Sequence, residues 1–140
     1  MKQTLKGWVR FIPAVLIMAA IFLLSSRTSD ELNTFLPWFQ ELFPQMQSFD
    51  WGHFIAYFAL ALSFDYGFGR RAERWPVKVL IVGLCLLYGV TDEYHQSFVS
   101  GRMPDAADLR NDSIGASIAV VLVALPGVKN LWRRLVASSD

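Results

Sequence analysis

The chain has 140 residues, of which 54% are hydrophobic and 18% are charged, and its formal net charge is +1. Soluble domains are about 45–50% apolar and about 25% charged, and a small domain needs much polar surface, so this composition excludes an ordinary soluble domain. The charge pattern shows no basic stripe interleaved with aromatic residues, so nucleic-acid binding is not expected. The single cysteine, Cys85, cannot form an internal disulfide, and no Cys/His zinc spacing is present.

Four apolar runs are candidates for membrane-spanning helices, each of which needs about 20 mostly apolar residues. They cover approximately residues 8–26, 52–69, 76–92 and 112–128. The first run also fits a signal peptide, but Arg27 follows it directly and three more runs come later. We therefore expect a single domain, residues 1–140, that is all-α and forms an integral membrane four-helix bundle.

The connection between the first two runs has a pattern of its own. Thr28 and Glu31 fit a capping box at the start of a helix. Apolar residues then recur at intervals of three and four, as on one face of a helix: Leu32, Phe35, Leu36, Phe39, Leu42, Phe43 and Met46. Pro37 and Pro44 are expected to break or bend this segment. The pattern predicts a short amphipathic helix on the membrane interface, or a loop that packs over the helix ends.

The positions of arginine and lysine predict the orientation of the chain. Basic residues gather in the N-terminal segment, in the connection between the second and third runs, and in the C-terminal segment: Lys2, Lys6, Arg10, Arg70, Arg71, Arg74, Lys78, Lys129, Arg133 and Arg134. The other two connections carry several acidic residues. We expect both termini in the cytoplasm, an even number of spans, and a location in the cytoplasmic (inner) membrane.

Two groups of residues are interpreted as structural. Asp65, near the cytoplasmic end of the second run, is expected to cap the helix or to pair with Arg70 or Arg71. The tryptophans near the ends of the runs are expected to anchor the chain at the membrane interfaces: Trp8, Trp38, Trp51, Trp75 and Trp132.

Polar residues share helix faces at the expected outer ends of the second and fourth runs. Asp50 and His53 are three residues apart, and Tyr57 continues their face at the next turn. Asp108 and Asp112 are four residues apart at the start of the fourth run. Charged groups at membrane depth are costly and usually face one another, so these residues predict a polar cavity.

The third run ends at the same predicted depth. Asp92 and Gln96 share a face there, with Glu93 beside them, and His95 points either into the cavity or toward the interface. Arg102 follows in the next connection and is a natural partner for Asp92, Glu93 or an acid of the fourth run, or for an anionic ligand.

These residues form an ordered pattern that resembles the VanZ-like family of membrane proteins. The pattern is Asp50-x-x-His53-x-x-x-Tyr57, Asp92-Glu93-x-x-Gln96-x-Phe98, Gly101-Arg102 and Asp108-x-x-x-Asp112-x-x-Gly115. The chain departs from it at Trp51, Ser100 and Asp112, where the family often has lysine, proline and asparagine. The resemblance implies a polytopic helical membrane protein. The founding member of the family is associated with raised teicoplanin resistance, which makes a link to the cell envelope an expectation here.

Several functions fit this pattern. The first is binding or handling of an anionic lipid or cell-envelope precursor in the outer leaflet, with Arg102 on a phosphate. The second is a membrane-embedded hydrolase or transferase that uses acid–base or metal chemistry on a lipid-linked substrate. No HExxH, GxSxG or Walker motif is present, so no catalytic residue, metal ligand or cofactor is assigned. The third is a structural role, in which the polar residues hold the helices together and the protein acts through a partner. The remaining alternative is a transporter or channel.

Overall fold

The computed structural model describes residues 7–42, 44 and 50–137, without the side chains of residues 39, 50 and 137. Within these ranges the structure is helical and contains no strand. The elements are α2 (Ile12–Ser25), α3 (Ser29–Leu42), α4 (Asp50–Phe68), the short 3-10 helix η1 (Gly69–Glu73), α5 (Trp75–Gln96), α6 (Ala106–Leu122) and α7 (Pro126–Ala137). The all-α prediction is therefore confirmed.

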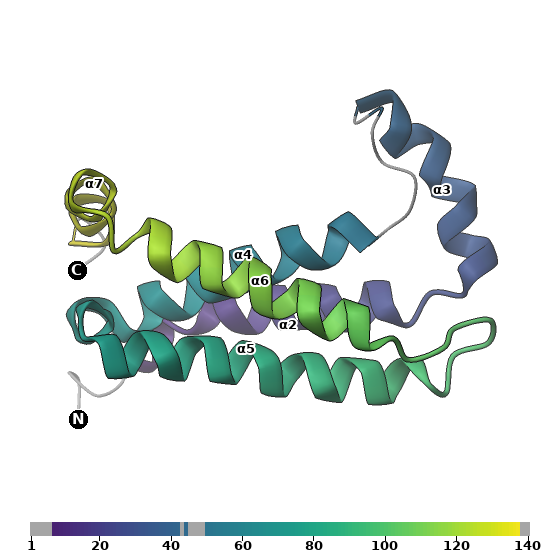
Figure 1. The fold of residues 1–140 in the computed structure, drawn as a ribbon, viewed down its shortest axis with the longest axis horizontal. Coiled ribbons are helices and arrows are strands. Elements are labelled where there is room, and N and C mark those ends of the chain that lie inside the picture. The colour runs from purple at the N-terminus through teal and green to yellow at the C-terminus, as the bar shows by residue number, and fades with distance from the viewer. Residues whose placement is uncertain (1–6, 43, 45–49, 138–140) are drawn as a thin grey trace.

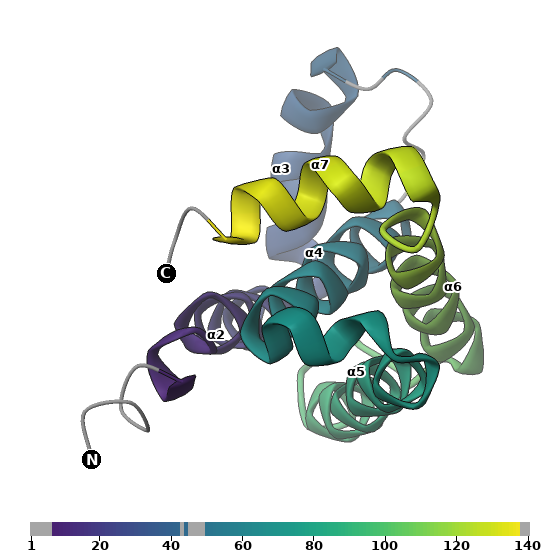
Figure 2. The same ribbon diagram turned by 90° about the vertical axis from the view of Figure 1, so that its left-hand side faces the viewer.

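The long helices lie side by side and alternate in direction. In Figure 1, α2 and α5 run from left to right, whereas α4 and α6 run back. α4 contacts α2, α5 and α6, and α6 also packs against α5. Figure 2 looks at the left-hand end, where α7 lies across the other helices. The opposite end, where α2 and α5 finish and α4 and α6 begin, is called the site end below.

Small residues allow α4 and α6 to approach closely. A Cβ atom on Gly115 of α6 would lie 2.5 Å from the carbonyl oxygen of Phe54 in α4, so only glycine fits at this position. Ala116 and Ala119 continue the same buried face of α6. On the facing side, Leu60 and Ala61 of α4 are fully buried. Small residues at helix contacts are typical of membrane proteins, in which packing replaces the hydrophobic effect between helices.

Large apolar side chains cover much of the outer surface. Leu16, Leu23 and Leu87 are all more than 60% exposed, which suits contact with lipid rather than water. Two helical segments are long and apolar enough to cross a membrane, Gly7–Ser25 and Trp75–Gln96. α6 and α7 together pass the same test but meet at an angle of 89°. These helices suit an integral membrane protein, whereas the predicted four-span bundle stays a prediction.

α3 begins as its sequence predicts. The backbone N–H of Thr28 donates to Glu31 Oε2 at 3.0 Å, and the N–H of Glu31 donates to Thr28 Oγ1 at 3.3 Å, so the capping box is confirmed. The helix continues through Pro37 to Leu42, so Pro37 does not break it. The last two residues of the predicted apolar stripe, Phe43 and Met46, lie outside the described residues.

An ionic cluster joins α4, α5 and α7 at the end opposite the site end. Asp65 is fully buried; it lies 3.3 Å from Lys78 Nζ and 2.8 Å from Arg133 Nη2, and it accepts a 2.8 Å hydrogen bond from Trp132 Nε1. The predicted pairing of Asp65 with Arg70 or Arg71 is wrong, because the crosswise helix α7 brings Arg133 to the carboxylate instead. Trp132 is likewise bonded within this cluster, whereas the other four tryptophans are exposed.

Candidate functional site

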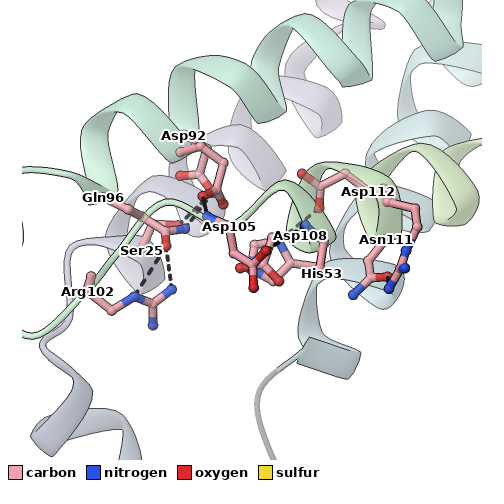
Figure 3. Close-up of polar contacts among 12 residues, drawn as sticks. Ser25, His53, Asp92, Gln96, Arg102, Asp105, Asp108, Asn111 and Asp112 are labelled. Carbon is pink, nitrogen blue, oxygen red and sulfur yellow. Dashed lines mark hydrogen bonds and ion pairs between the residues drawn. The ribbon is translucent and has the colours of Figure 1, made fainter.

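The polar residues predicted from the sequence gather at the site end. The final turns of α2 and α5 and the first turns of α4 and α6 supply them, and the connection from Ser97 to Asp105 adds the rest (Figure 3). The name polar cluster is used here for Ser25, His53, Asp92, Glu93, Gln96, Arg102, Asp105, Asp108 and Asp112. Asp50 begins α4, and its side chain lies outside the described part of the structure.

A chain of hydrogen bonds connects Arg102 to α2. Arg102 donates from Nη2 and Nε to Gln96 Oε1, at 2.6 and 3.2 Å. Gln96 donates from Nε2 to Asp92 Oδ2 at 3.2 Å, and Ser25 Oγ donates to the same oxygen at 2.9 Å. Figure 3 shows the guanidinium of Arg102 at the edge of this chain. The buried Asp92 carboxylate is thus held by neutral donors, and the cation is held by a neutral acceptor.

His53 lies between two carboxylates of α6. Its Nδ1 is 2.8 Å from Asp112 Oδ1, and its Nε2 is 3.5 Å from Asp108 Oδ2 (Figure 3). The spacing of four residues puts both aspartates on one face of α6, as the sequence predicts. The ring of Tyr57 is nearly parallel to the imidazole, with the centroids 6.4 Å apart. Tyr57 is fully buried beneath the cluster.

Glu93 fixes the loop that leads into α6. Its Oε2 accepts a 2.8 Å hydrogen bond from the backbone N–H of Asp105. Asp105 in turn caps α6, since its Oδ1 accepts from the N–H of Ala107 at 2.7 Å. The other oxygen of Glu93, Oε1, is buried and has no hydrogen-bond partner among the described residues. Glu93 therefore holds this loop through one carboxylate oxygen, while the other oxygen takes no part in that contact.

Gly89 of α5 leaves the space that Asp112 occupies. A Cβ atom at position 89 would lie 2.7 Å from Asp112 Oδ2 and 3.2 Å from Leu109 Cδ2. Any side chain there would displace the carboxylate that contacts His53. The geometry of the polar cluster thus depends on a residue that contributes no polar group to it.

An apolar groove of about 900 Å³ opens beside the polar cluster. Its polar part is formed by Ser25, Arg27, His53, Tyr57, Asp92 and Arg102. Its apolar walls come mainly from α2, α3 and α4: Ile17, Ala20, Ile21, Leu24, Leu32, Phe35, Trp38, Trp51, Ile55 and Ala56. A site with apolar walls and a few convergent polar groups is typical of ligand pockets, and this one suits an amphiphile.

The structure bears on two residues whose partners were left open by the sequence. Arg102 was expected to meet Asp92, Glu93 or Asp108, or an anionic ligand; in the described structure its side-chain hydrogen bonds go to the neutral amide of Gln96. His95 stacks on Phe22 of α2, with the ring centroids 4.3 Å apart, and is not hydrogen-bonded to the polar cluster. Of the two orientations left open for His95, the structure has the one away from the cluster.

Sequence reasoning missed two members of the polar cluster. Ser25 was not among the predicted site residues, although its Oγ donates to Asp92 Oδ2 across the helices. Asp105 was not singled out, but an aspartate after proline and just before a helix is a common N-cap signal that would have identified it. The functional assignment of the predicted site residues stays a prediction.

Comparison with known proteins identifies the family. The family model described as VanZ/LLP1 matches residues 10–127. No curated protein and no solved structure matches the chain. The matched segment covers most of the sequence and includes every residue of the polar cluster, and two apolar helices long enough to cross a membrane lie within the structure. The chain therefore belongs to the VanZ/LLP1 family and is a VanZ-like membrane protein.

Proposed function

We propose that this protein binds an anionic lipid or a lipid-linked cell-envelope precursor in the outer leaflet of the cytoplasmic membrane. In this proposal the chain crosses the bilayer four times, with helices α2, α4, α5 and α6, and both termini are cytoplasmic. The site end then faces outward. The excess of basic residues at the opposite end and in the terminal segments supports this orientation.

The observation that carries the proposal is the position of Arg102 in the polar part of the lining of the apolar groove. Its guanidinium has hydrogen bonds only to a neutral amide in the described structure, so its charge is not matched by a bonded carboxylate. The planar guanidinium of arginine suits a phosphate, because two of its N–H groups can donate to two phosphate oxygens at once. The groove walls on α2 and α4 extend from this polar part along the membrane-facing surface. A phosphate at Arg102 and an acyl or prenyl chain in the groove would satisfy both features.

Native mass spectrometry of the full-length protein released from vesicles tests this proposal. Three kinds of vesicle are used. Phosphatidylglycerol vesicles offer an anionic phospholipid, and phosphatidylcholine vesicles doped with a polyprenyl phosphate offer a lipid-linked precursor. Vesicles of phosphatidylcholine alone are the control without an anionic lipid. We expect an anionic-lipid adduct in the wild type and about a tenfold or greater loss in Arg102→Gln, since hydrogen bonds to charged groups contribute about 1.5–3 kcal/mol. The matched control is Arg110→Gln, because Arg110 is exposed and does not line the groove.

The outcomes separate the candidate ligands. Selective retention of the polyprenyl phosphate supports an envelope precursor, and retention of phosphatidylglycerol supports a membrane phospholipid. Equal retention of phosphatidylcholine, or equal loss in both arginine variants, contradicts a specific anion site at Arg102. A contribution to teicoplanin resistance belongs to the same proposal and is expected only if a precursor is the ligand.

A second candidate function is favoured by one specific arrangement. His53 lies between Asp108 and Asp112, with Glu93 beside them, which are residue types that perform acid–base chemistry or bind metals. A membrane-embedded hydrolase or transferase would use this arrangement on the lipid-linked substrate held in the groove. Turnover of a polyprenyl-linked substrate by the wild type, lost in His53→Gln, would favour the enzyme over the binding protein.

A further inference from the structure

The polar cluster contains more carboxylates than cations. Asp92, Glu93 and Asp112 are all at least 95% buried. The basic groups within the cluster are His53 and Arg102, and Arg102 bonds an amide. Buried charges are costly unless they are paired and hydrogen-bonded. The composition of this end of the molecule therefore suits an additional positive charge.

Three of the side chains converge on one point. His53, Glu93 and Asp108 each offer a ligand atom, and these atoms lie within 4.8 Å of one another. The 3.5 Å between His53 Nε2 and Asp108 Oδ2 matches two ligands of one ion, because atoms bound at about 2.1 Å in a tetrahedron lie roughly 3.4 Å apart. The residues come from α4, α5 and α6, so the point lies where three helices meet.

Two further observations indicate a ligand at this point. Asp112 holds His53 by Nδ1 at 2.8 Å, which leaves Nε2 facing Asp108. Histidine ligands of metals almost always have their other ring nitrogen bonded in this way. In addition, Glu93 is 95% buried, and its Oε1 has no hydrogen-bond partner among the described residues. A buried oxygen of this kind needs an explanation, and a bound ion is one that also fits the neighbouring His53 and Asp108.

We propose that His53, Glu93 and Asp108 bind a divalent transition-metal ion, with Asp112 positioning His53. One imidazole and two carboxylates suit Zn²⁺ or Mn²⁺; Ca²⁺ takes six to eight oxygen ligands and Mg²⁺ prefers oxygen ligands and water. Three protein ligands leave coordination positions open, which is the arrangement of sites that bind or activate a further molecule. This proposal does not depend on the contact of a lipid phosphate with Arg102; the two sites share His53, which also lines the apolar groove.

Metal binding to the purified full-length protein tests the proposal. After chelation and removal of the chelator, Mn²⁺ is titrated and the bound ion is counted by electron paramagnetic resonance, with Zn²⁺ as competitor. We expect one ion per chain that Zn²⁺ displaces and that equal Mg²⁺ or Ca²⁺ does not. Glu93→Gln and Asp108→Asn should each weaken binding by at least tenfold, and Asp112→Asn by about 10–100-fold, the usual effect of losing the group that orients a ligand. Asp30→Asn, an exposed acid of α3, is the matched control and should bind normally.

A spectroscopic readout on the unmodified protein keeps the test independent of how the variants fold. Spin-echo modulation of the bound Mn²⁺ detects coordinated imidazole nitrogen, and it should be present in the wild type and in His95→Gln. Absence of stoichiometric Mn²⁺ and Zn²⁺ binding, or a bound ion without imidazole coupling, overturns the proposal. So does binding that is unchanged in folded Glu93→Gln and Asp108→Asn. Lipid binding measured in the same variants shows separately whether the Arg102 site is intact.

Discussion

Asp65 shows how one buried residue organises the end of the molecule opposite the site. Its carboxylate is fully buried against Lys78, whose side chain is also almost fully buried, and against Arg133 and Trp132. Burial makes this arrangement sensitive to the removal of one partner, because the remaining charge then lacks compensation. Replacing both members of a buried ion pair by apolar groups has a much smaller effect on stability than removing one of them.

We predict that Asp65→Asn lowers the free energy of unfolding by about 3–5 kcal/mol, because Lys78 is left buried without its counter-charge. The double variant Asp65→Leu, Lys78→Met should regain part of the loss, because the buried lysine is gone and Arg133 keeps Glu73 as a partner. Thermal unfolding in one detergent compares these proteins, with Glu41→Gln as an exposed control. A single variant as stable as the wild type would show that the ion pair is not energetically important.

Among the elements, the α4–α6 pair depends most on close approach. The backbone of Phe54 stands where a Cβ atom on Gly115 would lie, and backbone cannot move aside as a flexible side chain can. We predict that Gly115→Ala lowers stability by about 1–3 kcal/mol through overpacking. Gly83→Ala is the matched control, since Gly83 lies in α5 with nothing within 4 Å of the added carbon. Equal stability of both variants, measured by thermal unfolding, would contradict the close packing of these two helices.

α7 is tied down partly by a surface ion pair. Lys129 Nζ lies 2.9 Å from Glu73 Oε2, and this hydrogen bond is the main reason that the pKa of Glu73 lies below its ordinary value of 4.5. Because the folded-state pKa is lowered, the pair stabilises the protein fully above pH 4.5 and loses this effect as the pH falls through the lowered pKa. Exposed pairs contribute at most about 1 kcal/mol.

The expected result is a small loss of stability in Glu73→Gln at neutral pH that disappears under acid conditions. Unfolding of the two proteins should therefore converge once the pH is well below 4.5. Proteolysis at the end of α7 gives a second readout, because a released helix is cut faster. A difference that persists or grows at acid pH would mean that Glu73 acts through something other than its charge.

For the whole molecule, the orientation proposed above can be tested at two exposed positions. Met103 is 85% exposed in the loop at the site end, and Arg71 is exposed in η1 at the other end. In intact cells, a membrane-impermeant maleimide should label Met103→Cys and should label Arg71→Cys only after permeabilisation. The native Cys85 is fully buried, so it should not react with the maleimide. The reverse labelling pattern would place the polar cluster on the cytoplasmic side and would contradict the proposed binding of a lipid in the outer leaflet.

The sequence was most informative where local spacing decides the structure. The capping box of α3, the shared face of Asp108 and Asp112, and the pairing of Asp92 with Gln96 all follow from intervals of three or four residues. These contacts lie within one helix or on one helix face, so they need no knowledge of how the helices pack.

Contacts between distant segments were not predictable in the same way. The partner of Asp65 depends on the 89° change of direction between α6 and α7, which brings Arg133 to α4. The choice of Gln96 rather than an acid for Arg102 depends on how the connecting loop folds back over α5. Ser25 joined the cluster because α2 packs beside α5, and no spacing in the sequence encodes that contact.

Gly89 has a consequence for how such sites are found and altered. The position holds no functional group, yet an added methyl would push Asp112 from its place and release the ring of His53. Gly89→Ala should thus weaken the metal binding proposed for His53, although all the proposed ligands remain in the chain. The geometry of the polar cluster therefore depends on the missing side chain at position 89 as well as on its polar side chains. A relative that keeps His53, Asp108 and Asp112 but has a larger residue at position 89 would place these polar side chains differently.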